Sequence, residues 1–155
     1  MIYLGFHDKS QIIFFSEYKA AEQDDLWNHL TMQAHSDGTL PESVTVKEIM
    51  DTWTLQMGFP VVNVERNYDD NTAVVDQKRY LTTAPKKDDG HTYKWWVPIT
   101  FTEPGTAFDN TYSKVWIKPE DDSVRVEGLP APDVPAIFNV QERTHEFKFH
   151  LIIVI

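Results

Sequence analysis

Residues 45–62, TVKEIMDTWTLQMGFPVV, constrain the fold most strongly, because they contain the start of a helix, its end and the start of a strand. Thr45 and Glu48 form a capping-box pattern, in which each side chain accepts a hydrogen bond from a backbone N–H of the first turn. Gly58 can adopt the left-handed conformation that ends a helix, and Pro60 cannot continue one. Between these signals, apolar residues recur at helical spacing and predict one buried face: Val46, Ile49, Met50, Trp53 and Met57. The sequence therefore predicts a helix that closes at Gly58 and β-structure after it.

A second helical pattern occupies residues 20–34. Its first turn carries acidic residues, which are favoured at the positive end of a helix dipole. Its apolar residues gather on one side: Leu26, Trp27, Leu30 and Ala34. Asp37 and Gly38 interrupt this pattern before the capped helix begins. The two helices are predicted to pair as a helical hairpin, with one tryptophan on each apolar stripe.

After Pro60 the periodicity changes to alternation, which is typical of half-buried strands. Six short strands are predicted: residues 61–66, 72–81, 93–102, 111–118, 123–126 and 136–141. The first two are expected to pair around the turn-rich cluster 68–71, and residues 111–118 are expected to pair with 123–126. Short strands at this spacing favour an antiparallel β-sandwich. The predicted fold class is mainly β with an N-terminal helical part: an antiparallel β-sandwich preceded by a helical hairpin.

Aromatic residues concentrate in residues 93–102, YKWWVPITFT. Alternation places Trp95 and Trp116 in the sandwich core. Trp96 points to the face opposite Trp95, so it is the candidate for an exposed contact, above all with a neighbouring domain that is missing from this chain. The alternative is that these three tryptophans and Tyr112 form a platform for a sugar or a peptide.

Three segments, in this order, resemble the M1 class of zinc aminopeptidases of the membrane aminopeptidase N type: AEQDDLW at 21–27, the helix-to-strand stretch at 45–62 and a Q-x-R-Y-L run at 77–81. The resemblance extends over residues 18–142. It implies that residues 1–59 are the last helices of a catalytic domain, and that residues 60–155 form a β-sandwich domain with an atypical or truncated last strand. It also implies a parent enzyme that removes N-terminal residues from peptides with one zinc ion.

The motifs that such an enzyme needs do not occur in this sequence. The family resemblance calls for an H-E-x-x-H helix with a further glutamate, which together bind zinc and activate its water, a Gly-x-Met-x-Asn type segment for the substrate amine, and a tyrosine for the oxyanion.

Histidines offer only a superficial likeness to a metal site. His145 and His150, with Glu146 between them, would point to opposite faces of a strand. His29 and His35 do not share a helical face. We therefore predict no catalytic, cofactor-binding or metal-binding residue in this chain, and zinc only in the parent.

Charge and composition exclude several classes of protein. The sequence has 24 acidic against 14 basic residues and a formal net charge of −10, which repels phosphate backbones and argues against nucleic-acid binding. It has no cysteine, so disulfides and thiolate metal sites are excluded. No targeting signal and no membrane span are predicted. The compartment is not indicated, and only the resemblance implies a membrane-anchored or extracellular parent.

The last residues, RTHEFKFHLIIVI, depart from the family pattern and alternate apolar residues: Phe147, Phe149, Leu151, Ile153 and Ile155. They are expected either to form a substitute closing strand or to stay free and promote self-association. Departures from the family at both ends suggest the hypothesis of an alternative transcript or a truncated gene product.

Three functions are compatible with the sequence. The favoured one is a non-catalytic spacer portion of an M1-type aminopeptidase, inactive alone, whose partners are the parent's catalytic and C-terminal domains and which meets peptide substrate only through them. The second is a stand-alone β-sandwich module that binds a protein or a glycan. The third is an unrelated hydrolase with a site of Asp, Glu and His residues that spacing does not reveal.

Overall fold

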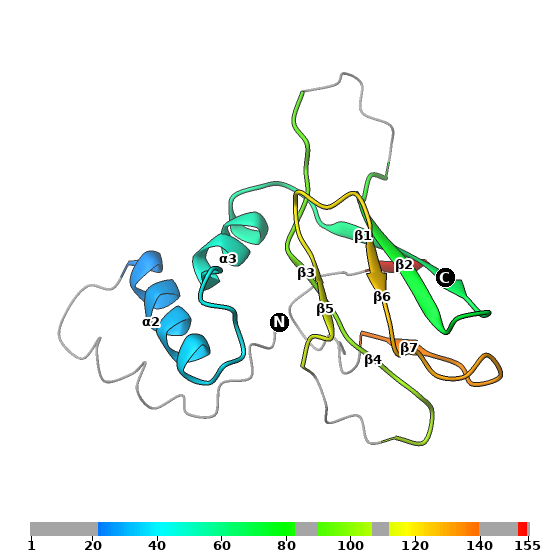
Figure 1. Ribbon diagram of the computed structural model, residues 1–155. Coiled ribbons are helices and arrows are strands. Elements are labelled where there is room, and N and C mark those ends of the chain that lie inside the picture. The colour runs from blue at the N-terminus through cyan, green and yellow to red at the C-terminus, as the bar shows by residue number, and fades with distance from the viewer. Residues whose placement is uncertain (1–21, 83–89, 107–111, 140–151, 155) are drawn as a thin grey trace.

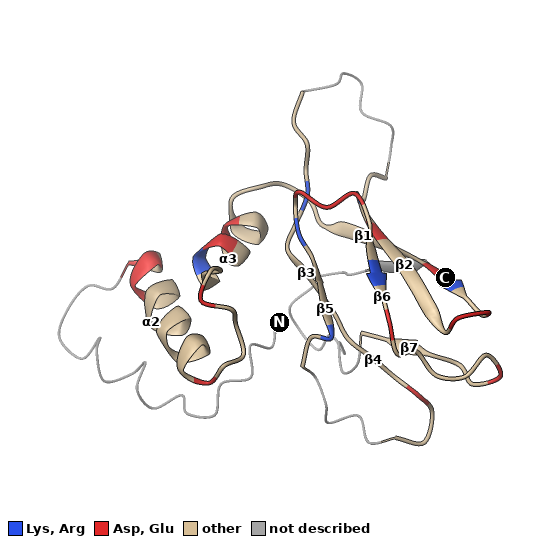
Figure 2. Cartoon of the chain, in the orientation of Figure 1, with Lys and Arg blue, Asp and Glu red and all other residues tan. Residues whose placement is uncertain are grey.

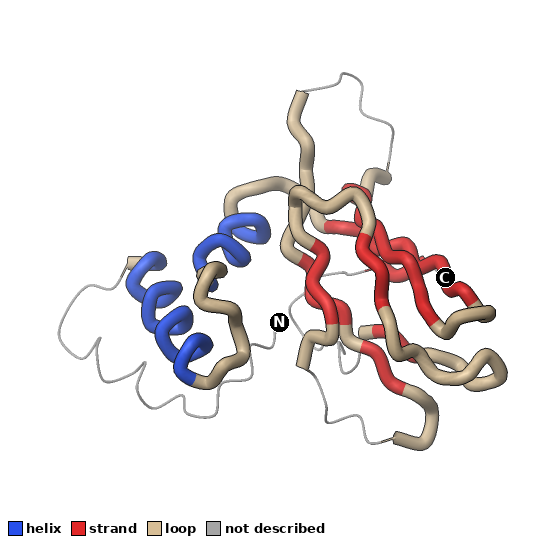
Figure 3. Tube along the Cα trace, viewed as in Figure 1, coloured by secondary structure: helices blue, strands red, loops and turns tan. Residues whose placement is uncertain are grey.

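The computed structural model describes residues 22–82, 90–106, 112–139 and 152–154 of the protein. Its elements are α2 (Gln23–Ser36), α3 (Val46–Thr54), β1 (Pro60–Asn67), β2 (Thr72–Arg79), β3 (Val97–Ile99), β4 (Phe101–Thr102), β5 (Val115–Ile117), β6 (Val124–Val126), β7 (Ile137–Phe138) and β8 (Ile152–Val154). Figures 1 and 3 show the two helices on one side and the strands gathered on the other, with α3 between α2 and the strands. The predicted fold class, a helical hairpin followed by a β-sandwich, is confirmed.

The capping box predicted at the start of α3 is confirmed. The hydroxyl of Thr45 accepts a hydrogen bond from the N–H of Glu48 at 3.2 Å, and the Glu48 carboxylate accepts one from the N–H of Thr45 at 2.8 Å. The N–H of Val46 donates to the hydroxyl of Thr31 on α2 at 2.9 Å. Helix α2 therefore satisfies a backbone group that the first turn of α3 leaves unpaired.

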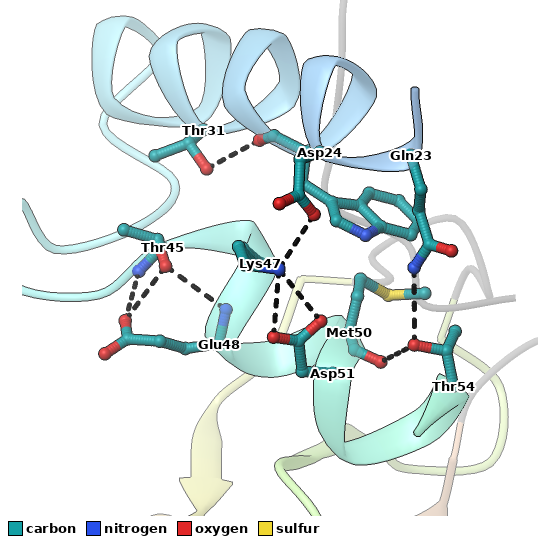
Figure 4. A network of polar contacts seen from close by, with 10 residues as sticks. Gln23, Asp24, Thr31, Thr45, Lys47, Glu48, Met50, Asp51 and Thr54 are labelled. Atoms are coloured by element: carbon teal, nitrogen blue, oxygen red, sulfur yellow. Dashed lines mark hydrogen bonds and ion pairs between the residues drawn. The ribbon is translucent and has the colours of Figure 1, made fainter. Parts of the chain in front are cut away.

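A polar network joins the two helices (Figure 4). The ammonium of Lys47 lies 2.8 Å from Asp24 on α2 and 3.2 Å from Asp51 on α3. Hydrogen bonds from this ammonium to Asp24 and then to Asp51 raise the pKa of Lys47 above its ordinary value. The groups are exposed, so the pairing of the helices depends mainly on the apolar cluster between them: Ala34, Leu40, Val46 and Ile49.

The end of α3 differs from the prediction. The helix stops at Thr54 rather than at Gly58, and Met57, expected on the buried stripe, is 72% exposed. The side-chain amide of Gln56 donates to the carbonyl oxygen of Thr52 at 2.6 Å, and so occupies the acceptor that the next helical N–H would use. Gly58 then turns the chain at φ +100°, close to the Arg79 side chain.

Strands β1 and β2 form the predicted hairpin. They pair antiparallel from Pro60↔Arg79 to Asn67↔Thr72 around the predicted turn, in which Asn71 has a φ of 55°. The register places Val62 opposite Gln77 and Val64 opposite Val75, and all four side chains are buried. This face of the hairpin is the main wall of the sandwich core.

The later strands correct two predictions. The aromatic strand 93–102 is divided, so that only Val97–Ile99 and Phe101–Thr102 are strand. Strands β5 and β6 do not pair with each other: β5 pairs with β3, and β6 pairs with β2. The carboxylate of Asp121 accepts from the N–H of Lys118 at 2.9 Å and closes a tight turn that carries the chain from one sheet to the other.

The end of the chain supplies a strand to the larger sheet, which has the order β6-β2-β1-β8. Residues 152–154 pair with Val61–Asn63 of β1. The expectation of a substitute closing strand is therefore confirmed for the backbone of residues 152–154. This pairing is parallel, whereas the other described strand pairs are antiparallel. Phe147, Phe149, Leu151 and Ile155 lie outside the described residues.

The residues that the structure describes form two apolar core clusters, and Trp53 packs against both. The cluster between the sheets contains these buried residues: Val62, Val64, Ala73, Val75, Trp95, Val97, Ile99, Ile117, Val126 and Leu129. The second cluster lies between the helices. The indole ring of Trp53 lies 6.5 Å from that of Trp95, and its Nε1 donates to the carbonyl of Trp96 at 2.9 Å. One side chain therefore connects the helical part to the sheet part.

Trp53→Ala is expected to lower the free energy of unfolding by about 3 kcal/mol, because it removes packing from both clusters and leaves the Trp96 carbonyl without its donor. Urea denaturation followed by circular dichroism measures this loss. Leu55→Ala is the control, since Leu55 is 73% exposed just beyond the same helix, and should change stability by less than about 0.5 kcal/mol. Equal effects of the two variants would contradict the assigned role of Trp53.

Candidate functional site

The candidate metal ligands that the structure describes, His29 and His35, each interact with other groups of the chain. The Nε2 atom of His35 lies 2.8 Å from the carbonyl oxygen of Val44, so this imidazole links the end of α2 to the loop before α3. His29 also interacts with another group. His145, Glu146 and His150 lie outside the described residues. Among the residues that the structure describes, no group of three or more His, Asp or Glu side chains is placed to hold a metal ion. These residues do not offer the ligand set of a zinc peptidase.

The tryptophans do not form an open platform. Trp95 is fully buried in the core between the sheets, as predicted. Trp96 and Trp116 are half-buried against the helical cluster, with their ring centroids 6.2 Å apart in an edge-to-face arrangement. The prediction of Trp116 in the sandwich core is wrong, because β5 pairs with β3 so that its neighbour Ile117 faces that core. Trp96 does pack outside the sandwich core, as expected, but the helices that it meets belong to this chain. Tyr112 is half-exposed.

A site with many side-chain hydrogen bonds in the described part of the chain is the backbone of residues 94–96, which we name the clasp segment. It precedes β3 and belongs to no strand. The carboxamide of Gln77 on β2 accepts from the N–H of Trp95 and donates to its carbonyl, both at 2.8 Å. Gln77 is only 7% exposed. This side chain therefore replaces a strand neighbour on the sheet side of the clasp segment.

Helix α3 satisfies the other side of the clasp segment. The hydroxyl of Thr52 accepts from the N–H of Trp96 at 3.2 Å, and the indole of Trp53 donates to the carbonyl of that residue. The amide of Gln56, just after the helix, donates to the carbonyl of Lys94 at 2.7 Å. Five backbone polar groups in three residues are thus paired with side chains from β2, from α3 and from Gln56 just after α3.

Sequence reasoning missed this site. A signal was present, since Gln77 stands at an inward-facing position of an alternating strand, where a polar side chain needs an internal partner. The sequence does not say which backbone that partner would be.

A shallow surface hollow of about 470 Å³ lies beside the β1–β2 turn and is lined by Glu65, Arg66, Asn67, Tyr68, Asp69 and Val74. The guanidinium of Arg66 is held by the proline-rich connector LPAPDVP, residues 129–135, because it donates to the carbonyls of Pro130, Ala131 and Val134 at 2.7 to 3.0 Å. Arg66 therefore anchors the connector rather than offering an unpaired charge to a ligand.

The β1–β2 turn is also one of the acidic places on the surface, together with the β5–β6 turn and the start of α2 (Figure 2). Asp70 is charge-paired there: it accepts from the hydroxyl of Thr72 at 2.6 Å and from Arg125 on β6 at 2.7 Å. The Thr72 hydrogen bond is the largest cause, and Arg125 a further one, that lowers the pKa of Asp70 below its ordinary value of 3.8.

Apolar side chains are exposed where the helical part meets the sheets. Leu55 and Met57, between α3 and β1, are more than 70% exposed, and Tyr80 and Leu81, just after β2, are 38% and 48% exposed. The ring of Tyr80 stacks on Phe59 at 4.9 Å. The remainder of the stripe predicted on α3 is covered within this chain, since Ile49 is fully buried and Trp53 partly so.

Comparison with known proteins gives a consistent result. No family model matches the chain. Over 119 residues, or 73% of this chain, it is 27% identical to the human thyrotropin-releasing hormone-degrading ectoenzyme, of which it covers 11%. It is 37% identical to human aminopeptidase Q over 111 residues, which are 70% of this chain and 10% of that protein. It is 34% identical to bovine aminopeptidase N over 100 residues, or 63% of this chain and 10% of the relative.

These relatives define a class, the aminopeptidases. They are members of the M1 family of that class, and the chain is homologous to one stretch of M1-family aminopeptidases. The chain spans about a tenth of the length of the curated relatives it matches. None of the helices that the structure describes is long and apolar enough to cross a membrane.

The pairing of Asp70 predicts a defined pH dependence. A carboxylate with a lowered pKa stabilises the folded state above the pKa of the unfolded chain, and this contribution is lost as the pH falls through the folded-state pKa. The stability advantage of the native protein over Asp70→Asn should therefore be present above about pH 4 and disappear at more acidic pH. Chemical denaturation at a series of pH values measures this difference.

The cause can be tested by carboxyl NMR titration. Thr72→Val keeps the shape of the buried side chain but removes its hydroxyl, so the pKa of Asp70 should move up toward 3.8. Arg125→Gln should produce a smaller rise. An unchanged Asp70 pKa in Thr72→Val would contradict the assigned cause.

Proposed function

We propose that this chain is a non-catalytic, spacer-type portion of an M1-type aminopeptidase, in which a helical pair and a β-sandwich hold other parts of the enzyme in position. The proposal is carried by homology to M1 aminopeptidases over a stretch that amounts to about a tenth of their length. In this proposal the parent uses zinc to remove N-terminal residues from peptides. The chemistry belongs to parts of the parent outside this stretch.

Two features of the structure support a mechanical role. The polar side chains that converge on the clasp segment bind backbone and so stabilise the fold. The candidate ligand His35 is also engaged by backbone. The domain division at residues 59 and 60 is part of the proposal, with the helices as the end of the catalytic domain and residues 60–155 as the sandwich domain.

The partners proposed for the chain are the catalytic and C-terminal domains of the parent. The exposed apolar group at the junction, Leu55, Met57, Tyr80 and Leu81, supports this part of the proposal, because side chains of this kind favour burial against another protein surface. Peptide substrate would be met only through those domains. An extracellular or membrane-anchored location of the parent is proposed from the relative described as an ectoenzyme.

Zinc analysis of the purified chain, combined with release of the chromophore from an amino-acid anilide, tests the proposal. We expect substoichiometric zinc and no turnover above buffer, while an intact M1 aminopeptidase assayed in parallel cleaves the anilide. One zinc per chain accompanied by turnover would overturn the proposal and favour a hydrolase.

The second candidate, a stand-alone module that binds a protein, is favoured by the same exposed residues. Light scattering over a range of protein concentrations distinguishes the two. An unpartnered spacer is expected to bind hydrophobic dye and to self-associate through Leu55 and Met57, and the double variant Leu55→Asp, Met57→Asp should remain monomeric. Val74→Asp, on a strand of the larger sheet and 40% exposed, is the control and should associate like the native chain. A native chain that stays monomeric at every concentration would instead support the self-sufficient module.

A further inference from the structure

We propose that the clasp segment locks the helical hairpin and the sheets into one cooperative unit, so that the connection between α3 and β1 does not act as a hinge. This inference goes beyond the spacer function and stands without it, because it concerns contacts within this chain. It depends on three features: the position of the clasp segment between two elements, the burial of its partners and the second contact made by Trp53.

The position of the clasp segment makes its hydrogen bonds interdependent. Its five backbone groups are divided between the sheet, through Gln77, and the helical part, through Thr52, Trp53 and Gln56. If the hairpin moved away, the N–H and carbonyl of Trp96 and the carbonyl of Lys94 would lose their partners together. Unpaired backbone groups in a partly buried site oppose such a movement.

On the sheet side, Gln77 is buried, so its carboxamide also needs hydrogen-bond partners within the protein. Its carboxamide donates to Trp95, and it also lies 3.4 Å from the carbonyl of Lys118, at the end of β5. One side chain of β2 therefore contacts both the clasp segment and Lys118, the residue just after β5. A displaced clasp segment would remove both bonds of this buried amide to Trp95 and leave it only the long contact with Lys118.

Trp53 adds an apolar contact to these hydrogen bonds. It packs against both clusters, and its ring meets Trp95, whose backbone is held by Gln77. A fluctuation that opens either cluster exposes part of the same indole. Unfolding of the helical part and unfolding of the sheets are therefore expected to occur together.

Native-state hydrogen exchange of the full chain, measured on backbone amides, tests the proposal. Gln77→Leu changes a residue of β2 only, yet the slowest amides of both α2 and β1 should exchange at least about tenfold faster, since leaving buried groups unpaired shifts a cooperative equilibrium by that factor or more. Gln33→Leu is the matched control: it makes the same substitution on α2, where the side chain contacts Asp37 and not the clasp segment, and should leave exchange in β1 unchanged.

The reciprocal variant keeps the test valid if Gln77→Leu fails to fold. Thr52→Val removes from α3 the hydroxyl that accepts from Trp96, while retaining a side chain of similar shape. It should accelerate the slowest amides of β1 and β2 by the same factor as those of α2. Acceleration confined to the element that carries the substitution, in either variant, would overturn the proposal and show that the connection is a hinge.

Discussion

The backbone of Trp95 sets the main constraint on this structure. It lies in the core, where a polar group without a hydrogen bond is strongly unfavourable, and yet it belongs to no strand. Gln77 resolves this conflict by presenting one acceptor and one donor from a single buried side chain. The arrangement resembles the paired hydrogen bonds that two residues exchange in an antiparallel ladder. It also places the indole of Trp95 against Trp53, so the packing of the helices follows from a hydrogen-bonding requirement of the sheets.

Local patterns predicted the elements well where short-range signals determine them. The capping box at Thr45, the turn before Asn71 and the alternation of Val62 and Val64 each depend on a few neighbouring residues, and each was found. The predicted end of α3 was wrong because a distant residue takes part in ending the helix. The side chain of Gln56 donates to a carbonyl within the helix and also to the carbonyl of Lys94, which is far away in sequence. Helix propensity and spacing contain no information about that partner.

Strand pairing and the candidate site also depend on contacts between residues that are distant in sequence, which local patterns do not predict. Adjacent strands joined by a short turn are expected to pair, but β5 and β6 take partners in different sheets, because the turn closed by Asp121 directs them apart. The pairing of β5 with β3 turns Trp116 toward the helices. Periodicity could place Trp95 and Trp96 on opposite faces, and the structure agrees, but it could not show that the second face is covered by helices of the same chain. The importance of Gln77 follows only from the tertiary pairing.

The spacer role proposed above requires the chain to transmit orientation, and a connection of five residues cannot do this alone. Residues 55–59 include Gly58 and carry two strongly exposed apolar side chains, so within this connection the restraints come from Gln56, which donates to Lys94, and from Phe59, which stacks on Tyr80. What limits rotation at this point is the set of contacts made on either side of the connection by Trp53 and Gln77. The exposed Leu55 and Met57 are then presented from a fixed frame, which lowers the entropy lost when another surface covers them. The clasp segment that satisfies a buried backbone is therefore also consistent with the docking of another domain that we propose at this junction.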